Sequence, residues 1–560
     1  MFTLQAERAI FGSFFNPDLI VSPGMKKFFM AKNSGSLPNL KGLSLNLGSI
    51  KKKLPFDPKR EYDAVVIGGG TGGLSFVQEA RELGLSVVMF NHVNPTPKLG
   101  YKWGLGGTCV NVGCVPKKLF HNAGLIKESI HMAHDYGWDV ELKDDKIKWE
   151  TLRTNVQNHI KGINFSYVSK MKEIGVDYIE AKASINESQN VVFDFDDTQY
   201  ELKAKNIIIA TGGRPRYLPN IEGADFKFED ECITSDDLFA LDKSPGKTLV
   251  VGGGYIALEC AGFLKELGND VIMINRSSFL RVFDQTIAGK ILENMVGGNL
   301  KAFGKTTITN ITKEDEDQYL VDLLIDGEPK KAKVNSILLA IGRDPNTHVV
   351  ENSGVKINPR SFKVEGRVEE PERTCVDQIY ALGDILEGVP ELMPVAQKSG
   401  TLLAHRIYHR NKGELTEKEI LKKYSMDYSN IATTVFSNVE YSYVGLNEEE
   451  AIEKYGEDNI EIYHREVTPL EASIYSENSR TAYMKLIVER NETEKVIGIH
   501  YLGPSAGEVI NGFGLAMKLG ITKKDIDNTI GIHPTVGEDF FNLTVTKRSG
   551  KDYIKTDCCS

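Results

Sequence analysis

Two pairs of cysteines have the spacing that thiol–disulfide exchange requires. Cys109 and Cys114 are separated by four residues and lie between a Gly-Gly pair and a Val-Pro-Lys-Lys stretch. Cys558 and Cys559 are adjacent and come directly before the final residue, Ser560. Adjacent cysteines can close an eight-membered ring, which is strained and therefore comparatively easy to reduce. We expect the two pairs to exchange electrons with each other.

The surroundings of the first pair favour redox chemistry over metal binding. A helix is predicted from about residue 116 to residue 134, and Pro116 suits its first turn because a missing N–H costs nothing there. Cysteines at a helix start have lowered pKa values and form thiolates readily. The alternative is half of a zinc site, but no partner pair of Cys or His residues is apparent, so no metal site is expected.

A histidine and a carboxylate near the end of the chain could manage protons for these thiols. His533 and Glu538 are five residues apart, and Pro534 follows the histidine. A carboxylate can orient an imidazole and keep it basic enough to take a proton from a thiol. Such a pair is more often structural when it stands alone, but beside two redox cysteine pairs we expect it to be catalytic.

A glycine turn in the first third of the chain predicts a dinucleotide site. The strand at residues 62–67 runs into Gly-Gly-Gly-Thr-Gly-Gly at residues 68–73, and a helix follows. In this G-x-G-x-x-G pattern Gly68 makes the tight turn, Gly70 lets the backbone approach a pyrophosphate, and Gly73 lets helix and strand pack closely. The strand at 86–90 then ends in Asn91, where an acidic residue would normally accept the ribose hydroxyls.

A second glycine turn follows in the middle of the chain. After a strand at 247–251, Gly252 and Gly254 begin a G-x-G-x-x-A turn that again leads into a helix. The next strand, at 271–274, is followed by Arg276 and Arg281. An acid here would suit NAD, whereas arginine suits the 2′-phosphate of NADP. Plain solvated charges are the alternative for the two arginines.

The other predicted strands complete the fold. Buried-strand runs at 206–213 and 336–343 follow the two glycine turns in equivalent places, and a run at 379–384 ends in Asp384, which suits a polyol chain. From about residue 425 the pattern changes to antiparallel strands and amphipathic helices. We expect an α/β fold with two doubly wound, Rossmann-like units and an α+β domain.

Composition narrows the class of protein. The 560 residues predict about three domains, and seven cysteines are too few for a secreted disulfide scaffold. No apolar run approaches the roughly 18 residues of a membrane span, and the net charge of −10 gives no reason to expect nucleic acid. The other cysteines, Cys232, Cys260 and Cys375, lie among apolar neighbours and are expected to be buried thiols without chemistry.

The first 60 or so residues differ from the rest. Between residues 20 and 56 there are seven lysines and no acidic residue. This composition fits either an organelle-targeting segment or a disordered extension. Transit peptides favour arginine over lysine, so we expect a cytoplasmic protein, with a mitochondrial or other organellar location as the alternative.

Together these motifs resemble those of the high-molecular-weight thioredoxin reductases, which are relatives of glutathione reductase. The resemblance covers roughly residues 60–560 and includes the Ala-Leu-Gly-Asp run at 381–384 and the terminal cysteines. It implies a homodimer in which NADPH reduces FAD, FAD reduces the Cys109–Cys114 disulfide, and this pair reduces Cys558–Cys559 of the partner chain. The tail would then reduce thioredoxin.

The resemblance also implies roles for single residues. Cys114 would lie nearest the flavin and Cys109 would be the interchange thiol, while Lys117 and Glu259 would pair beside the flavin and Tyr255 would gate the nicotinamide pocket. The cofactor-binding residues would be Gly68, Gly70, Gly73, Thr108, Lys117, Thr211, Gly212, Asp384, Gly252, Gly254, Tyr255, Glu259, Arg276, Arg281 and Gly342. The segments would be an extension (1–60), an FAD-binding domain (61–225, continued at 346–424), an NADPH-binding domain (226–345), a dimerisation domain (425–545) and a mobile redox-active tail (546–560).

Relatives differ from this chain at identifiable places. Glutathione reductases carry an arginine pair where this chain has Gln78 and Glu79, and they lack the terminal cysteines. Mercuric reductases lack the His-Pro…Glu pair, and dihydrolipoamide dehydrogenases use NAD, against which Arg276 and Arg281 argue. Asp557 also departs from the Cys-Cys branch, in which both flanks of the pair can be Ser. A non-catalytic flavoprotein scaffold is the alternative from another class, and the intact cysteine pairs argue against it.

Overall fold

The computed structural model describes residues 54–140, 147–221, 225–474 and 481–555. The predicted tail cysteines, Cys558 and Cys559, and most of the N-terminal extension lie outside the described residues.

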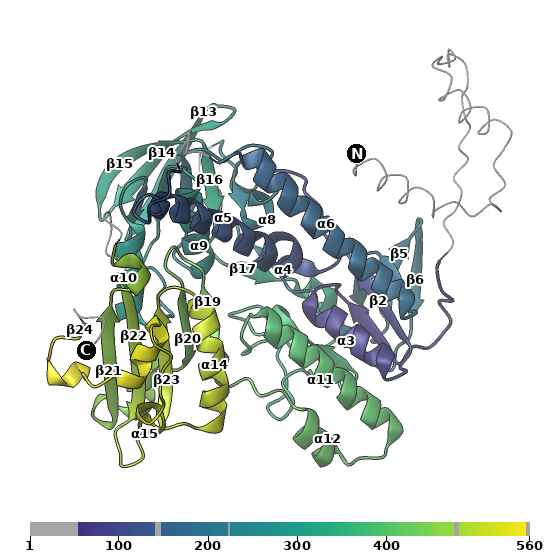
Figure 1. The fold of residues 1–560 in the computed structure, drawn as a ribbon. Helices are drawn as coiled ribbons and strands as arrows, with labels where there is room; N and C mark the ends of the chain where they lie inside the picture. The colour runs from purple at the N-terminus through teal and green to yellow at the C-terminus, as the bar shows by residue number, and fades with distance from the viewer. Residues whose placement is uncertain (1–53, 141–146, 222–224, 475–480, 556–560) are drawn as a thin grey trace, which may run out of the picture. The chain divides into compact units, whose positions relative to one another are not determined.

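The first sheet, whose strand β2 is labelled in Figure 1, is parallel throughout and has the strand order β18-β7-β1-β2-β3. Its strands are β1 (Ala64–Ile67), β2 (Val87–Asn91), β3 (Asp177–Glu180), β7 (Ile207–Ile209) and β18 (Ile379–Ala381). Ala64 and Val66 pack in a cluster with helices α3 (Thr71–Glu82) and α11 (Met393–Lys412). Val65 and Ile67 point the other way, into a cluster with the three-stranded sheet β4-β5-β6. Both faces are covered, which explains the continuous run of apolar residues in β1.

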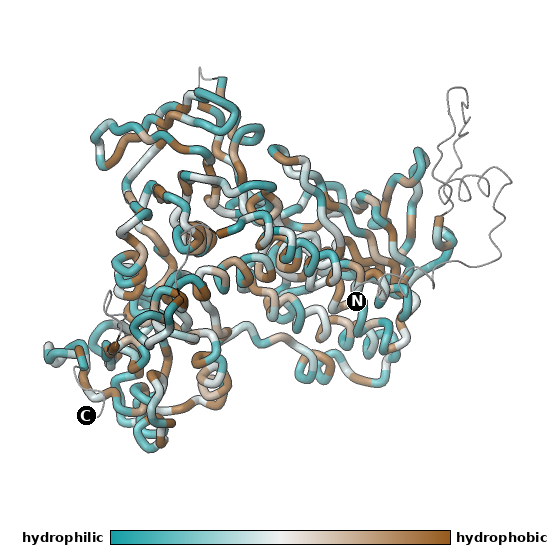
Figure 2. Tube along the Cα trace, turned by 45° about the horizontal axis from the view of Figure 1, so that its top comes forward, coloured by the Kyte–Doolittle hydropathy of each residue, from teal (hydrophilic) through white to brown (hydrophobic). Residues whose placement is uncertain are grey.

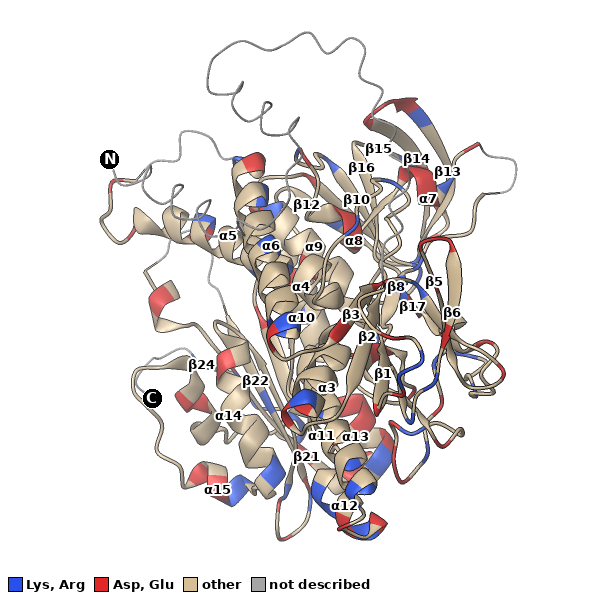
Figure 3. Ribbon diagram, turned by 90° about the vertical axis from the view of Figure 1, so that its right-hand side faces the viewer, with Lys and Arg blue, Asp and Glu red and all other residues tan. Residues whose placement is uncertain are grey.

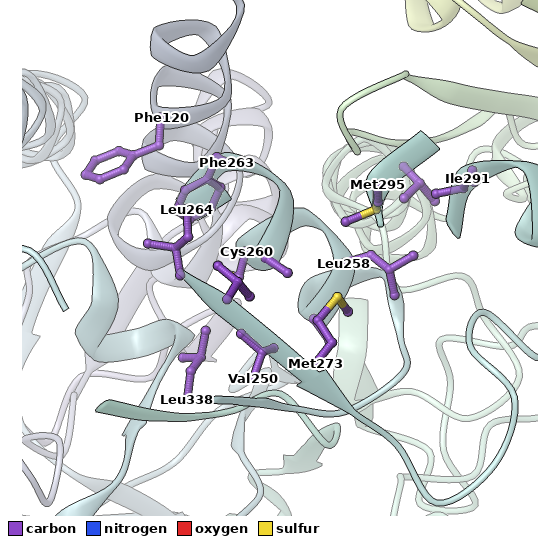
Figure 4. Packing of buried hydrophobic residues seen from close by; sticks show 14 of the residues in the cluster. Phe120, Val250, Leu258, Cys260, Phe263, Leu264, Met273, Ile291, Met295 and Leu338 are labelled. Carbon is purple, nitrogen blue, oxygen red and sulfur yellow. The ribbon is translucent and has the colours of Figure 1, made fainter. Parts of the chain in front are cut away.

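The second sheet repeats this arrangement with the order β12-β11-β10-β16-β9. Its strands are β9 (Ile233–Thr234), β10 (Thr248–Val251), β11 (Val271–Ile274), β12 (Leu300–Phe303) and β16 (Ser336–Leu339). On one face, Leu258 and Leu264 of α9 (Tyr255–Glu266) pack with Val250, Met273 and Leu338 (Figure 4). The opposite face packs on the antiparallel sheet β13-β14-β15.

The third sheet belongs to the last part of the chain and has the order β19-β20-β23-β22-β21-β24. Its strands are β19 (Thr433–Val435), β20 (Tyr441–Gly445), β21 (Ile460–Val467), β22 (Ala482–Glu489), β23 (Val496–Leu502) and β24 (Ile554–Lys555). Neighbouring strands are antiparallel except β21 and β24, and α14 (Ala506–Leu519) packs against the sheet. Figure 2 shows hydrophobic and hydrophilic segments interspersed along the trace, with hydrophilic stretches in several outer loops.

The remaining helices and strands connect these sheets. The helices are α4 (Gly107–Val112), α5 (Cys114–Ala133), α6 (Trp149–Glu173), α7 (Phe228–Glu231), α8 (Ser235–Leu238), α10 (Gln285–Met295), α12 (Glu417–Tyr424), α13 (Glu448–Tyr455) and α15 (Lys523–Asp527). The strands are β4 (Ala183–Ile185), β5 (Val191–Phe195), β6 (Thr198–Leu202), β8 (Gly213–Pro215), β13 (Thr306–Asp315), β14 (Gln318–Ile325), β15 (Glu328–Val334) and β17 (Arg343–Pro345). Short 3-10 turns complete the list, among them η4 (Leu470–Ala472) and η5 (Val536–Asn542).

The predicted fold class is confirmed, and two local predictions change. The 25-residue helix α6 was not predicted, because only five of its residues, Trp149, Val156, Gln157, Ile160 and Met171, are buried and the apolar pattern is weak. Cys232 and Cys260 are buried as expected, but the prediction for Cys375 is wrong: it is exposed, and its thiol donates to Gly354 O at 3.4 Å. Cys375 lies in a loop just before β18, so its apolar neighbours do not enclose it.

Charged residues of both signs alternate on the surface helices, for example on α12 and α15 (Figure 3). Within the described part of the chain, no helix is both long and apolar enough to cross a membrane.

Candidate active site

A cavity lies at the carboxyl ends of the first sheet's strands and extends to the start of α9 in the second unit. Ligands of open parallel sheets bind at this edge. The predicted site residues that line it are Gly68, Gly70, Thr108, Cys109, Cys114, Lys117, Thr211, Gly212, Tyr255, Glu259 and Asp384. The structure therefore brings together most of the residues named for the first cofactor and the inner cysteine pair.

The first glycine turn has the geometry of a phosphate cradle. Gly68 has φ +118°, and a Cβ on it would lie 2.2 Å from Ala210 O. A Cβ on Gly73 would lie 2.0 Å from Gly68 O, so the third glycine is needed for the packing of α3. Gly70 caps α3 without a side-chain hydrogen bond, and the first turn of α3 has no acidic residue. Free N–H groups at the positive end of this helix suit the pyrophosphate of FAD.

The second glycine turn is built in the same way. Gly252 has φ +143°, and a Cβ on it would lie 2.1 Å from Ala340 O. Gly254 caps α9, again without a side-chain hydrogen bond or an acidic residue in the first turn. A Cβ on Gly254 would meet no atom within 4 Å, so the space above this helix start is open to a ligand. The residues therefore fit a second dinucleotide.

Asparagine follows the second strand of each unit. Asn91 is buried, and its Oδ1 accepts the Gly69 N–H at 3.1 Å. Asn275 donates to Ser278 O at 2.8 Å and lies against Gly253. Each asparagine thus lies against its own glycine turn.

The inner cysteines lie on two consecutive helices. Cys109 is in α4, and Cys114 is the first residue of α5, so it faces the cavity from a helix N-terminus. A hydrogen bond from Cys109 lowers the pKa of Cys114 and outweighs its burial, and Lys117 lowers it further. The same hydrogen bond and burial raise the pKa of Cys109. In the reduced pair, the negative charge therefore resides on Cys114 and the proton on Cys109.

Lys117 is held in place by residues of the second glycine-turn unit and of the third sheet's domain. Its Nζ donates to Glu259 Oε1 at 3.0 Å, and Glu259 is buried in α9. Glu259 Oε1 also accepts the backbone N–H of Phe436 at 2.9 Å. The Phe436 ring lies 4.0 Å from Lys117 Nζ and 4.1 Å from Lys118 Nζ. The ring thus stabilises both lysines by cation–π contacts.

Asp384 and Tyr255 face the same cavity. Burial raises the pKa of Asp384, and the nearby Glu391 raises it further. A carboxyl group in this setting suits hydroxyl donors such as those of a ribityl chain. Burial likewise raises the pKa of Tyr255, so its hydroxyl stays protonated at neutral pH.

Sequence reasoning missed several wall residues. Arg343 donates to Thr108 Oγ1 at 3.3 Å and to Gly213 O at 2.8 Å, and pairs with Asp236 at 3.0 Å. Arg343 ends a predicted strand run, and this position was the only available signal. His92, Lys182 and His348 line the far end of the cavity near Asn91, and burial lowers the pKa of His348. No motif marks these three residues in the sequence.

The predicted proton-transfer pair forms but stands apart from the cavity. His533 Nδ1 lies 2.9 Å from Glu538 Oε1, and the His533 side chain is 61% exposed. Neither residue lines the cavity of Cys109 and Cys114. Exposed apolar residues lie nearby in the sequence and on α14, namely Ile530, Ile532, Leu515 and Leu519.

Arg276 and Arg281 also lie outside the cavity lining, after β11. Both are exposed, and within the described ranges neither forms an ion pair with a carboxylate. Gly342, with φ +115°, shapes the turn after β16. In the described part of the chain no group of three or more His, Cys, Asp or Glu residues could hold a metal ion.

Comparison with protein families agrees with this geometry. Residues 62–400 match the model of pyridine nucleotide-disulphide oxidoreductases. Residues 431–543 match the model of the dimerisation domain of pyridine nucleotide-disulphide oxidoreductases.

Proposed function

The chain belongs to the pyridine nucleotide-disulphide oxidoreductases, FAD-dependent enzymes with a dimerisation domain, and we propose that it is an NADPH-dependent thioredoxin reductase. The observation that carries the proposal is the Cys109–Cys114 pair, with its thiolate on Cys114 beside Lys117 and at the wall of the dinucleotide cavity. The adjacent cysteines at the chain's end supply a second redox pair that a protein substrate could reach.

FAD is assigned to the cavity of the first unit, with its pyrophosphate at the start of α3 and its ribityl chain at Asp384. The second unit would hold NADPH, and Tyr255, at the start of α9, would gate the nicotinamide from the wall of the cavity. When bound, the two cofactors would supply the electron pair that opens the Cys109–Cys114 disulfide. The domain boundaries predicted above are part of the proposal: FAD-binding 61–225 and 346–424, NADPH-binding 226–345, and dimerisation 425–545.

The reduced inner pair would pass its electrons to the tail by thiol–disulfide exchange. Cys109 attacks the Cys558–Cys559 disulfide of the partner subunit, so one bond between chains forms as the tail disulfide breaks. Cys114 then attacks Cys109, which re-forms the inner disulfide and releases the second tail thiolate. Lys117 and the helix start hold Cys114 as a thiolate for this attack.

His533 and Glu538 would manage the protons of this exchange in the partner's cleft. Cys109 must lose its proton to attack, and its raised pKa makes a nearby base necessary. Glu538 orients the imidazole through Nδ1, which leaves Nε2 to exchange protons. Because the pair is exposed and separate from the cavity of its own subunit, we propose that it serves the other subunit of a homodimer.

Glutathione is the competing substrate, and the structure gives one argument against it. At the place where glutathione reductases carry an arginine pair, Glu79 Oε1 lies 3.0 Å from His405 Nε2 of α11. A carboxylate engaged in this way offers no positive charge to the acidic tripeptide.

The decisive experiment compares the full chain with a truncation after Asp557. The full chain should oxidise NADPH with oxidised thioredoxin and respond weakly to oxidised glutathione and to mercuric ion. The truncated chain should keep its bound FAD and its NADPH-driven flavin reduction but lose thioredoxin turnover. Equal thioredoxin rates for both chains would show that the tail is not the electron carrier and that Cys109–Cys114 acts alone.

His533→Ala separates proton transfer from electron supply. Flavin reduction should be unchanged, while exchange with thioredoxin should slow by about 10²–10⁴-fold, the usual size of a general acid–base contribution. A variant with a normal thioredoxin rate would remove His533 from the mechanism.

A further inference from the structure

A buried cluster of charges joins the second unit to the third sheet, and neither glycine turn accounts for it. Lys485 of β22 is 1% exposed, and its Nζ donates to Asp284 Oδ1 and Oδ2 at 2.8 and 2.6 Å. The same Nζ donates to Glu448 Oε2 at 2.7 Å. Asp284 is 0% exposed and lies in the second unit, directly before α10. Three charged groups are thus buried where two domains meet, at a high cost in desolvation.

Asp284 is the last residue of the short segment that carries Arg281. Its carboxylate caps α10 by accepting the Ile287 N–H at 3.1 Å. It also accepts the Glu448 N–H at 3.4 Å, so it fixes the start of α13 in the third unit. Burial alone would raise the pKa of Asp284, but Lys485, His500 and the Ile287 N–H together lower it, so the carboxylate is ionised.

The other end of this segment is fixed to the second glycine turn. Leu280 N donates to Gly253 O at 2.7 Å, and Leu280 has φ +48°, a left-handed conformation that a non-glycine residue adopts at a cost. Gln285 Nε2 donates to the carbonyls of Leu280 and Phe283 at 3.0 and 2.7 Å. The ring of Phe283 makes edge contacts with Tyr441 and Tyr443 of β20. Only Arg281 and Val282 in this segment point to solvent.

We infer that Lys485 is a positioning residue for cofactor choice: through Asp284 it holds the 280–284 segment so that Arg281 meets the 2′-phosphate of NADPH. This inference rests on the NADPH preference proposed above. A flexible arginine in a free loop would lose conformational entropy on binding, whereas a clamped segment presents its guanidinium at a set distance from the glycine turn. The third unit would thereby contribute to the specificity of the second.

The test uses Lys485→Met in the flavin-loaded dimer, with Lys547→Met as the matched control. Lys547 also pairs with Glu448 but makes no bond to Asp284. Lys485→Met should raise the KM for NADPH by about tenfold, the effect of weakening one charge-assisted bond, and leave the NADH rates and the kcat for NADPH unchanged. Lys547→Met should leave both cofactors unaffected. A loss of the same size with both cofactors would mean that Lys485 is merely structural and would overturn the inference.

Lys485→Met leaves two buried carboxylates facing one another, which destabilises the fold. The double variant Asp284→Asn/Lys485→Met removes the charges of that pair together, leaves Glu448 paired with Lys547, and keeps a side-chain oxygen to cap α10. The readout for this variant is calorimetric binding of adenosine 2′,5′-bisphosphate and adenosine 5′-monophosphate, which requires no turnover. Selective weakening of the bisphosphate supports the inference, and equal affinities to those of the unmodified chain overturn it.

Arg281→Ala distinguishes failure of the inference from failure of the proposed function. If Arg281→Ala retains the full preference for NADPH, Arg281 does not bind the 2′-phosphate. The proposed basis of the NADPH preference is then wrong, and the Lys485–Asp284 contact has no phosphate-binding arginine to position. If Arg281→Ala loses the preference but the Lys485 variants keep it, the NADPH assignment stands and only the positioning role of Lys485 is wrong. Adding Lys485→Met to Arg281→Ala should cause no further loss of NADPH affinity, because both changes remove the same contact.

Discussion

The two glycine-turn units follow one plan and diverge after their second strands. Each begins with a glycine in a left-handed conformation, where a Cβ would lie 2.2 Å from a carbonyl oxygen in the first unit and 2.1 Å in the second. Each continues into an uncapped helix that lacks acidic residues in its first turn. Each packs a helix on one face of its parallel sheet and a three-stranded antiparallel sheet on the other.

The difference lies in what surrounds the turn. In the first unit Asn91 is buried, and the cavity beside it is closed by residues of α5, α9 and the Asp384 turn. In the second unit Asn275 is followed by the exposed Arg276 and, five residues later, by Arg281. The glycine turn that both units share provides a cradle for phosphate. The surroundings of the first turn fit a ligand that stays enclosed, whereas those of the second turn fit a ligand that arrives from solvent with extra negative charge.

The largest expected effect comes from blocking each turn separately. Gly68→Ala should remove bound FAD, because its Cβ would clash with Ala210 O and the backbone strain alone costs roughly 1–3 kcal/mol. Gly252→Ala should keep FAD but abolish flavin reduction by NADPH, since its clash is with Ala340 O in the other unit.

Flavin absorbance and NADPH-driven bleaching measure the two outcomes. Gly289→Ala in α10 is the control, because a Cβ there meets no atom within 4 Å. Loss of FAD from Gly252→Ala would break the comparison, since it would mean that the two turns do not act independently.

Removing the exposed cations should have the next largest effect. Arg276→Ala with Arg281→Ala should raise the KM for NADPH strongly and leave NADH little affected, because each contact to the 2′-phosphate is a charge-assisted bond worth about 1.5–3 kcal/mol. Steady-state kinetics with both cofactors check this. Equal losses with NADPH and NADH would show that the arginines are ordinary surface charges.

The positive charge of Lys117 beside the Cys114 thiolate, at the wall of the first unit's cavity, can be tested by its effect on a pH dependence. The pKa of Cys114 is lowered, so its alkylation by iodoacetamide should reach half its maximal rate at a lower pH than for a free cysteine. Lys117→Met should raise this midpoint, because the cation that favours the thiolate is lost. Lys118→Met is the control, since Lys118 contacts the same Phe436 ring but pairs with Glu440. Identical midpoints in all three proteins would exclude Lys117 from tuning Cys114.

The smallest effect is expected at the two asparagines. Asn91→Asp should slow the loss of FAD on dilution by a modest factor, consistent with one hydrogen bond worth about 0.5–1.5 kcal/mol. Asn275→Asp should leave FAD retention unchanged, since it lies in the other unit. Flavin fluorescence after dilution measures both variants. If Asn91→Asp retains FAD no better than the unmodified chain, the amide is an adequate substitute for an acid.

Local patterns in the sequence were sufficient for the fold class and for the two turns. A glycine turn between a strand and a helix depends on residues within a few positions of one another, so its geometry is encoded where it occurs. The same holds for the His533–Glu538 pair, which closes within five residues. The helix α6 escaped prediction because few of its side chains are buried, and a weak apolar period gives no clear signal.

Contacts between distant segments were decided only by the tertiary structure. Lys117 and Glu259 are 142 residues apart, and residue types alone do not pair them; the resemblance to a family suggested the pair, and the packing of α5 on α9 forms it. The Phe436 ring beside both lysines and the Lys485–Asp284 pair had no signal at all, because any lysine can meet any carboxylate until the sheets are placed. Cys375 shows the same limit in reverse: it was expected to be buried, but burial depends on what packs over a loop, and the structure leaves this thiol exposed with a hydrogen bond to Gly354 O.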